Sequence, residues 1–216
     1  IKNVGLQTAH LKAIHYFLNT LFFVQKDGPV GFNAFWQHAK ASATLMQSLA
    51  QEAKHASLDP IIAYRCGLLH NIGLLLLGHL FPPEFCLLNK MLWQSKKSSI
   101  EMLEKKLLGM GLAQKMFGCG HAWLGSKLLE YWQLPEPLII TAREHHHINY
   151  QGNYQEYVYL QIIANSLLKH QNLGEGMVLT FPELPLHELG LSTSLLNEYL
   201  EKKSLFISEE EPIVEI

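Results

Sequence analysis

Apolar residues recur at intervals of three and four positions along most of the chain, which is the period of an amphipathic helix. Residues 35–53 and 157–167 carry the clearest stripes, and each stripe predicts a helix with one buried face. Shorter stripes predict further helices over residues 61–69, 122–132, 137–142 and 195–200, the last of them capped by Ser192 or Ser194.

Start and stop signals separate these helices. Asp59 before Pro60 is typical of a helix start, because the Asp side chain caps free N–H groups and proline tolerates the first helical position. Pro82-Pro83 ends the apolar run before it and can begin the next helix. Ser98 and Glu101 form a capping-box pattern, which predicts a helix that ends near Gly109 or Gly111.

Strand patterns are weak, and residues 177–181 form the one short run that could be extended. No internal repeat, low-complexity tract or linker divides the chain. The sequence therefore predicts an all-α protein, a single helical domain over residues 1–216 built as a multi-helix bundle. A glutamate-rich tail from about Ser208 is expected to be solvated.

Composition and charge exclude several classes of protein. Hydrophobic residues make up 48% and charged residues 17%, which argues against extensive disorder. A net charge of −2 removes the electrostatic footprint of a general nucleic-acid binder. Three cysteines without a CxxC pair argue against a disulfide framework or a thiolate zinc cluster. The most apolar window, residues 66–81, is interrupted by His70, Asn71 and His79, so we expect a cytoplasmic protein without a membrane segment.

Histidine is the unusual residue, since the chain has 12 of them. Several lie at helix-bearing positions with apolar neighbours, where an unpaired imidazole is costly to bury. A lone histidine in such a place is most simply a hydrogen-bonded core residue, whereas several that converge can share a metal or a hydrogen-bond network. The histidines concerned are His38, His70, His121, His145 and His146.

Four blocks of sequence resemble the HD superfamily and, more narrowly, its regulatory branch, the HDOD family. The resemblance covers about residues 31–168. The blocks are Trp36-Gln37-His38, then Gly67-Leu68-Leu69-His70-Asn71-Ile72-Gly73, then His121 with Gly125, then Trp132-x-Leu134-Pro135 before His145-His146.

The resemblance implies a metal site, because catalytic members of the superfamily hold divalent metals with histidines and a His-Asp doublet. Those positions map here onto His38, His70, Asn71, His121, His145 and His146, with a late acidic position near Asn165. Two acidic positions are therefore asparagine, and a neutral amide oxygen is a poor ligand for a hard cation. Leu74 replaces a lysine that often follows the doublet, and residues 148–153 lack the Gly-Tyr-Pro signature of the hydrolases.

Three hypotheses follow. The preferred one is a non-catalytic bacterial signalling module that acts through signalling proteins, adjacent regulatory domains or a small-molecule ligand, and in which His38, His70, Asn71, His121, His145 and His146 form a vestigial metal site. This reading requires no cofactor, although the imidazoles could hold Zn, Ni, Fe or Mn. The alternative is a metal-dependent phosphohydrolase acting on a nucleotide or cyclic dinucleotide, with Asn71 as an adapted ligand. The third is a helical interaction scaffold with a remnant histidine cluster.

A few other side chains carry weaker expectations. Arg65, Arg143 and Glu144 could line a pocket for an anion, or form a solvated face with one local ion pair. Glu144 is also an example of an acidic residue that could be supplied to the histidine site from elsewhere in the chain. His147 is expected to be exposed, because three consecutive helical residues cannot face one centre. Tyr150, Tyr154, Tyr157 and Tyr159 are expected to pack with their hydroxyls in water.

Overall fold

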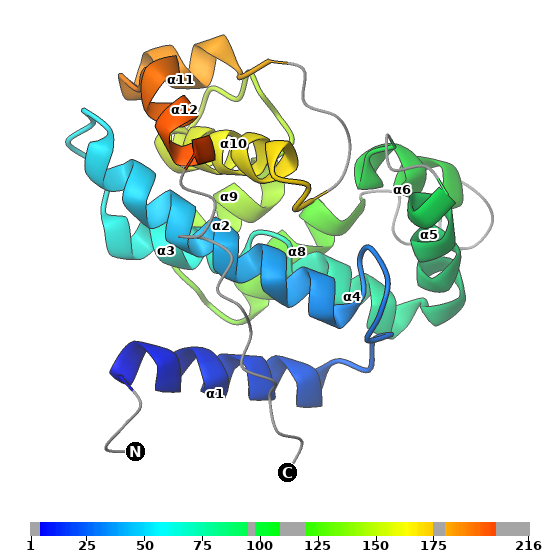
Figure 1. Cartoon of the computed structure of the whole chain (residues 1–216). Coiled ribbons are helices and arrows are strands. Elements are labelled where there is room, and N and C mark those ends of the chain that lie inside the picture. Colours follow the sequence, from blue (N-terminus) through cyan, green and yellow to red (C-terminus); the bar gives the residue numbers. More distant parts are fainter. Residues whose placement is uncertain (1–4, 95–97, 109–119, 175–179, 202–216) are drawn as a thin grey trace.

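A computed structural model describes residues 5–94, 98–108, 120–174 and 180–201, and in these segments it is all-helical (Figure 1). This confirms the predicted all-α single domain. The helices are α1 (Leu6–Leu21), α2 (Phe32–Glu52), α3 (Pro60–Leu69), α4 (Ile72–Leu80), α5 (Pro82–Gln94), α6 (Ile100–Leu108), α8 (Gly120–Tyr131), α9 (Glu136–Glu144), α10 (Gln155–His170), α11 (Glu183–Leu189) and α12 (Thr193–Glu201). The extended run at 177–179, the glycines 109 and 111 and the tail from 208 lie outside the described residues.

The predicted start signals largely hold. The Asp59 side chain accepts hydrogen bonds from the N–H groups of Ile61 and Ile62, at 2.7 and 3.4 Å, and so caps α3. At the start of α6, near the predicted capping box, the Ser99 hydroxyl accepts a hydrogen bond from the N–H of Met102 at 3.3 Å. Of the two candidate capping serines of α12, Ser192 lies before the helix and accepts a hydrogen bond from the N–H of Leu195, whereas Ser194 lies inside the helix.

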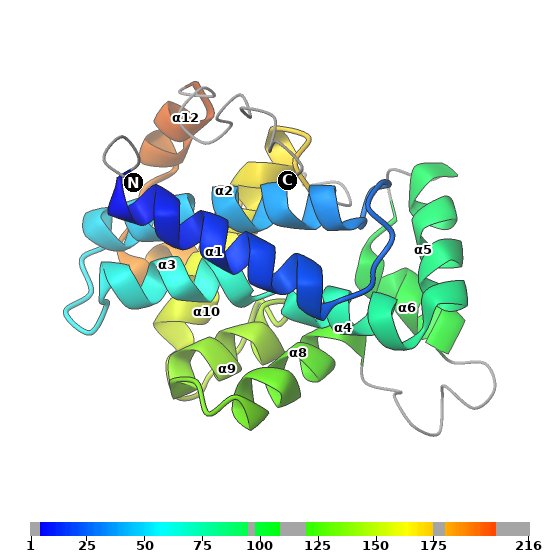
Figure 2. The ribbon, with the colours of Figure 1, turned by 90° about the horizontal axis from the view of Figure 1, so that it is seen from below.

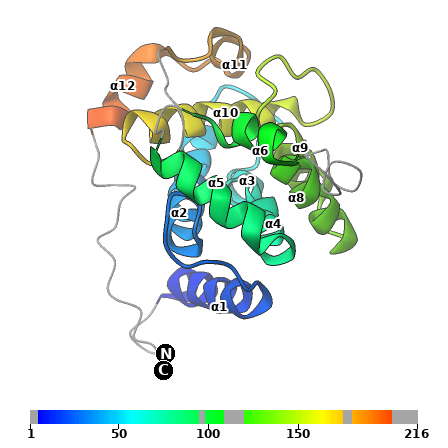
Figure 3. The ribbon, with the colours of Figure 1, turned by 90° about the vertical axis from the view of Figure 1, so that its right-hand side faces the viewer.

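Helix α2 runs through the middle of the molecule, with α1 on one side and α10 to α12 on the other (Figures 1 and 2). Helices α4, α5 and α6 gather at one end (Figure 3). Two hydrophobic clusters match this division. The larger surrounds α2, α3 and α10, and the smaller joins α4, α5, α6 and the start of α8. The helices α1 and α11 were not predicted, although α1 packs through Leu18 and α11 through Leu186 against the larger cluster.

Glycines allow the backbones that carry the histidines to approach closely. A Cβ at Gly67 on α3 would lie 2.7 Å from the Cα of Ala43 on α2. A Cβ at Gly73 on α4 would collide with the carbonyl oxygen of His121 on α8, and Gly125 faces Gly73 from the other side. These contacts bring the end of α3 beside α2 and the start of α8 beside α4.

One stretch of the described chain, Pro60–Leu80, is long and apolar enough to cross a membrane by composition, and 67% of its most apolar window is buried inside the domain. It consists of α3 and α4, which meet at the turn His70-Asn71. Its burial explains its hydropathy, because these two helices form part of the core. The cytoplasmic location stays a prediction.

Candidate metal centre and adjoining cavity

Five histidines converge from four places in the fold. His38 lies on α2, His70 ends α3, His121 lies in the first turn of α8, and His145 and His146 follow α9. His70, His121 and His145 are buried, with 1%, 1% and 2% of their surface exposed. These side chains lie close together because α3 and α9 end and α8 begins at this point.

The imidazole nitrogens lie close together. The Nε2 atoms of His38 and His70 are 3.3 Å apart, and the ring centroids of His70 and His145 are 5.1 Å apart. The Nε2 atom of His121 lies 3.4 Å from that of His145 and 3.1 Å from that of His146. His121, His145 and His146 each offer a nitrogen within 4.8 Å of the others, so this triad could hold a metal.

Hydrogen bonds on the far side of three rings fix their tautomers. The Nδ1 atoms of His70, His121 and His145 each lie 2.8 Å from an oxygen acceptor: the carbonyl of Gly67, the carboxylate of Glu104 and the carbonyl of Ala142. Since these acceptors cannot donate, we infer that each Nδ1 carries the proton and each Nε2 presents a lone pair. His121 and His145 thus point two lone pairs at each other across 3.4 Å.

Facing lone pairs repel unless a proton or a cation lies between them. Burial and the neighbouring histidines lower the pKa of His70, His145 and His146 well below the ordinary value, which disfavours an added proton. Burial also lowers the pKa of His38 to about 4, opposed by the Asn165 amide and assisted by the charge of Lys169. The nitrogen separations of 3.1 and 3.4 Å match the edge of a tetrahedron around Zn²⁺ with bonds of about 2.0 Å, roughly 3.3 Å. The residues present therefore fit a borderline divalent metal.

A carboxylate that the sequence analysis missed supports this cluster. Glu104 on α6 is 2% exposed, and its Oε2 accepts hydrogen bonds from the backbone N–H of His121 at 3.1 Å and from its Nδ1 at 2.8 Å. A signal was present, because Glu104 occupies the buried-face register of a stripe that contains Ile100, Leu103 and Leu107. A carboxylate behind a ligating histidine is the usual outer partner of a metal-bound imidazole.

Glu144, an acid that could have been supplied to the site, has other partners. Its carboxylate pairs with Arg143 at 2.6 Å and with His147, away from the converging Nε2 atoms. These two partners, one adjacent and one three positions further along the chain, account for the Glu144 carboxylate. His147 is exposed as predicted, with 65% of its side chain accessible.

The two asparagines differ in their hydrogen bonds. Asn71 is 9% exposed, and its Oδ1 has no hydrogen-bond partner. Asn165 on α10 accepts a hydrogen bond from Gln161 at 2.9 Å, and the same Gln161 amide donates to Ser42. The positions that would carry acids in a catalytic relative thus hold amides, one of them unpartnered.

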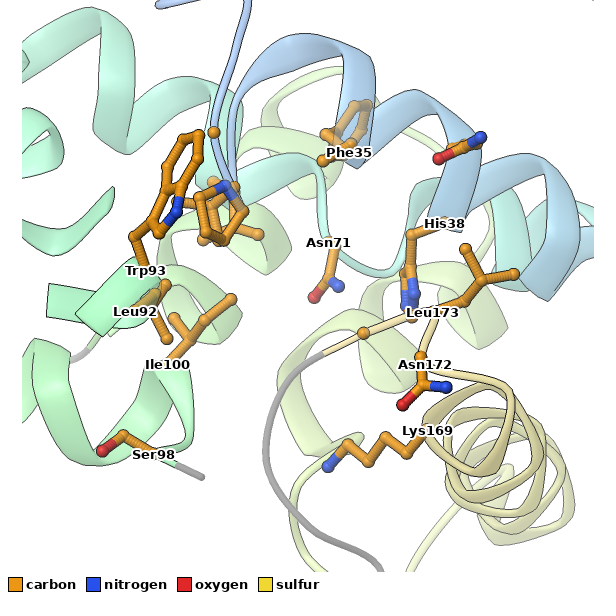
Figure 4. A pocket seen from close by; sticks show the side chains of 17 residues that line it. Phe35, His38, Asn71, Leu92, Trp93, Ser98, Ile100, Lys169, Asn172 and Leu173 are labelled. Carbon is orange, nitrogen blue, oxygen red and sulfur yellow. The ribbon is translucent and has the colours of Figure 1, made fainter. Parts of the chain in front are cut away.

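A cavity of about 590 Å³ adjoins the cluster, between the two hydrophobic clusters and the end of α10 (Figure 4). His38 and Asn71 form part of its wall, and Lys169, Asn172, Ser98 and Trp93 face the same space. Arg65 and Arg143 are not among its lining residues, and Arg143 pairs with Glu144, which agrees with the alternative of a solvated face with one local ion pair. Two tyrosine hydroxyls expected in water are bound instead: Tyr157 accepts from the N–H of Asp59, and Tyr159 donates to the carbonyl of Tyr150.

The comparison with known families settles the class of this fold. The HDOD domain family matches residues 1–148, which is more than half of the chain. This chain belongs to the HDOD domain family. The resemblance found in the sequence is thereby confirmed, and the HDOD match takes in His38, His70, Asn71, His121, His145 and His146.

Solved structures show the same fold. A candidate signal transduction protein from Marinobacter aquaeolei VT8 is 27% identical, with a TM-score of 0.76, over 92% of this chain and 42% of that protein. An HDOD domain protein of unknown function from Geobacter sulfurreducens is 20% identical, with a TM-score of 0.65, over 92% of this chain and 69% of that one. A candidate phosphohydrolase from Shewanella amazonensis SB2B is 19% identical, with a TM-score of 0.63, over 94% of this chain and 71% of that one.

Among curated proteins, an uncharacterized protein of Treponema pallidum is 33% identical over 86 residues, which are 40% of this chain and 15% of that protein. The HDOD chain described here thus spans less than half of both the Marinobacter protein and this relative. The domain boundaries proposed from the sequence, with a core at 31–168, stay a prediction.

Proposed function

We propose that this HDOD domain is a non-catalytic signal transduction module that acts through signalling proteins, adjacent regulatory domains or a small-molecule ligand, without nucleic acid or membrane as a partner. The observation that carries this proposal is the amide at Asn71, whose Oδ1 has no hydrogen-bond partner, at the position where the resemblance to catalytic HD proteins implies a carboxylate. Phosphate hydrolysis on a metal asks for a charged, water-activating centre, and neutral imidazoles with amides supply little negative charge.

The position of the remaining carboxylate supports the same proposal. Glu104 lies behind His121 and binds its Nδ1, so its charge orients the imidazole and is one ring away from the point where the Nε2 atoms converge. A metal held by His121, His145 and His146, with His38 and His70 beside them, would supply Lewis acidity when bound. The histidines would then hold and orient this metal, and none of them offers a carboxylate that could bridge it to a second cation.

Metal analysis and an activity screen test this proposal together. The protein is purified without an affinity column, its metal content is measured, and phosphodiesterase and nucleotidase substrates are screened in the presence of Zn²⁺, Ni²⁺, Fe²⁺ or Mn²⁺. We expect no turnover above the level of the His70→Ala variant. Turnover that disappears in His70→Ala would contradict the proposal.

One observation favours a second candidate function, a metal-dependent phosphohydrolase acting on a nucleotide or cyclic dinucleotide. The facing lone pairs of His121 and His145 belong to a histidine cluster whose His38 lines a cavity large enough for a substrate, and one structural neighbour is described as a candidate phosphohydrolase. This candidate requires stoichiometric metal together with turnover, whereas the regulatory module requires neither.

An interaction scaffold with a remnant histidine cluster makes a different prediction. In that case His121→Ala lowers stability, because the buried Glu104 loses its partner, but partner binding is unchanged. A selective loss of binding at an unchanged melting temperature would argue against the scaffold.

A further inference from the structure

We propose that the cavity beside the histidine cluster binds a small organic anion with an aromatic body, its anionic group at Lys169 and its ring against Trp93. This inference rests on the proposed function, since it gives the chemical class of the ligand that a regulatory module would sense. It is carried by three features of the cavity wall.

The first feature is charge. Lys169 is the one charged side chain among the described residues that line the cavity, and it forms no ion pair with an acidic side chain in the described part of the chain. Its ammonium group faces the cavity in Figure 4. The chain as a whole carries a net charge of −2, so a cationic cavity wall is a local property. One lysine matches one anionic group, and a polyphosphate would need more cations.

The second feature is an unsatisfied buried amide. Asn71 is 9% exposed, its Oδ1 has no partner, and its side chain points into the cavity (Figure 4). A buried polar atom without a partner is costly, and a ligand hydroxyl or amino group would remove that cost. Asn172 and Ser98 add further polar groups to the cavity lining.

The third feature is an aromatic and aliphatic wall opposite the lysine. Trp93 is 67% exposed at the edge of the cavity, an unusual exposure for the largest apolar side chain. Leu92 and Ile100 are buried beneath it, and Leu74 and Phe35 continue the apolar lining. An aromatic ring placed there would cover Trp93 and gain stacking as well as apolar burial. The cavity volume of about 590 Å³ lies within the range of small-molecule sites, roughly 300–1,000 Å³.

Isothermal titration with four probes tests the proposal: naphthoate, naphthyl phosphate, neutral naphthol and inorganic phosphate. We expect one or both naphthyl anions to bind at least about tenfold more tightly than naphthol, and inorganic phosphate to bind more weakly than either anion. Tighter binding of naphthoate identifies a carboxylate ligand, and tighter binding of naphthyl phosphate identifies a phosphate ester. Equal binding of naphthol and the anions would overturn the proposal.

Two variants and two matched controls locate the site. Lys169→Gln should weaken binding of the anions about tenfold, and Trp93→Ala should weaken it about fivefold while Trp93→Phe retains it. Lys127→Gln and Trp123→Ala alter a lysine and a tryptophan of α8 that do not line the cavity and should leave binding unchanged. If Trp93→Ala does not fold, NMR on the unsubstituted protein replaces it. The indole N–H resonance of Trp93 is assigned by its absence in Trp93→Phe, and it must shift when the naphthyl anion is added.

The result also separates this inference from the proposed function. Absence of binding by every probe, or unchanged binding in Lys169→Gln, would overturn the ligand class and leave the regulatory function standing. Release of naphthol from naphthyl phosphate, lost in His70→Ala, would contradict the non-catalytic function while the binding result still reports on the cavity.

Discussion

The carboxylate of Glu104 holds His121 twice, through the backbone N–H at 3.1 Å and through Nδ1 at 2.8 Å. The first contact places a negative charge at the first turn of α8, where free N–H groups and the helix dipole favour it. The second fixes the proton on Nδ1 and turns the Nε2 lone pair toward His145 and His146. One buried side chain thus ties α6 to α8 and prepares an imidazole to bind a cation.

Replacement of Glu104 should separate these two roles. Glu104→Gln retains an oxygen acceptor but removes the charge, so we expect Zn²⁺ affinity to fall about tenfold with a small change in the free energy of unfolding. Glu104→Ala removes both acceptors and should cost about 1–3 kcal/mol of stability. Competition with a chromophoric chelator measures the affinity and urea denaturation the stability. The exposed Glu130→Gln is the control, and an equal loss of affinity there would contradict the role of Glu104.

Stability should depend on pH through the buried histidines. Burial lowers the pKa of His38 to about 4 from 6.5, so between these values the unfolded state binds a proton that the folded state does not. The free energy of unfolding is therefore highest above about pH 6.5 and falls as the pH decreases toward 4, by about 3 kcal/mol for His38 alone. Urea denaturation at about pH 7 and about pH 5 measures the loss.

The matched variant for this pH dependence is His38→Gln, which should reduce the loss between the two pH values. His187→Gln, at a histidine with 86% of its side chain exposed, should not change it. A pH dependence identical in His38→Gln and the unsubstituted protein would show that His38 does not titrate as described.

The helices could be predicted because their signals are local. The Asp59-Pro60 start and the apolar stripe of α2 depend on neighbours within one or two turns, and both elements form where expected. The convergence of the histidines could be predicted only from the family resemblance. No local sequence pattern indicates that the end of α3 lies beside the start of α8. In the structure, Gly73 explains how the turn after α3 reaches α8, because a side chain there would hold α4 away from His121, and Gly67 in the same way lets α3 approach α2.

The support of the site could not be predicted in the same way. Glu104 reaches His121 because α6 packs on the first turn of α8, a tertiary contact across 17 positions of sequence. Glu144 was the more obvious acid because it adjoins His145, yet adjacency on a helix end does not direct two side chains to one centre. The cavity combines residues from α2, α4, α5 and α10, so its lining could not be read from any one segment.

Restoring the acid of the doublet should convert an amide site into a stronger metal site. In Asn71→Asp, we expect Mn²⁺ affinity to rise at least about tenfold, because a carboxylate is the ligand that hard cations prefer. Without metal, the buried charge should cost about 1–3 kcal/mol, and added Mn²⁺ should recover it. Thermal unfolding with and without the metal measures both effects. Asn153→Asp, at an exposed loop position, is the control, and an equal metal response there would contradict the site assignment.

The close approach of α4 and α8 should make Gly73 intolerant of any side chain. In Gly73→Ala the new Cβ would collide with the carbonyl oxygen of His121, which is backbone and cannot rotate away. We expect a loss of about 3 kcal/mol or more, and weaker metal binding as His121 moves from His145 and His146. Gly5→Ala is the matched substitution, since a Cβ there meets nothing within 4 Å. Urea denaturation compares the two, and equal stabilities would show that α4 and α8 are not in the contact that positions His121.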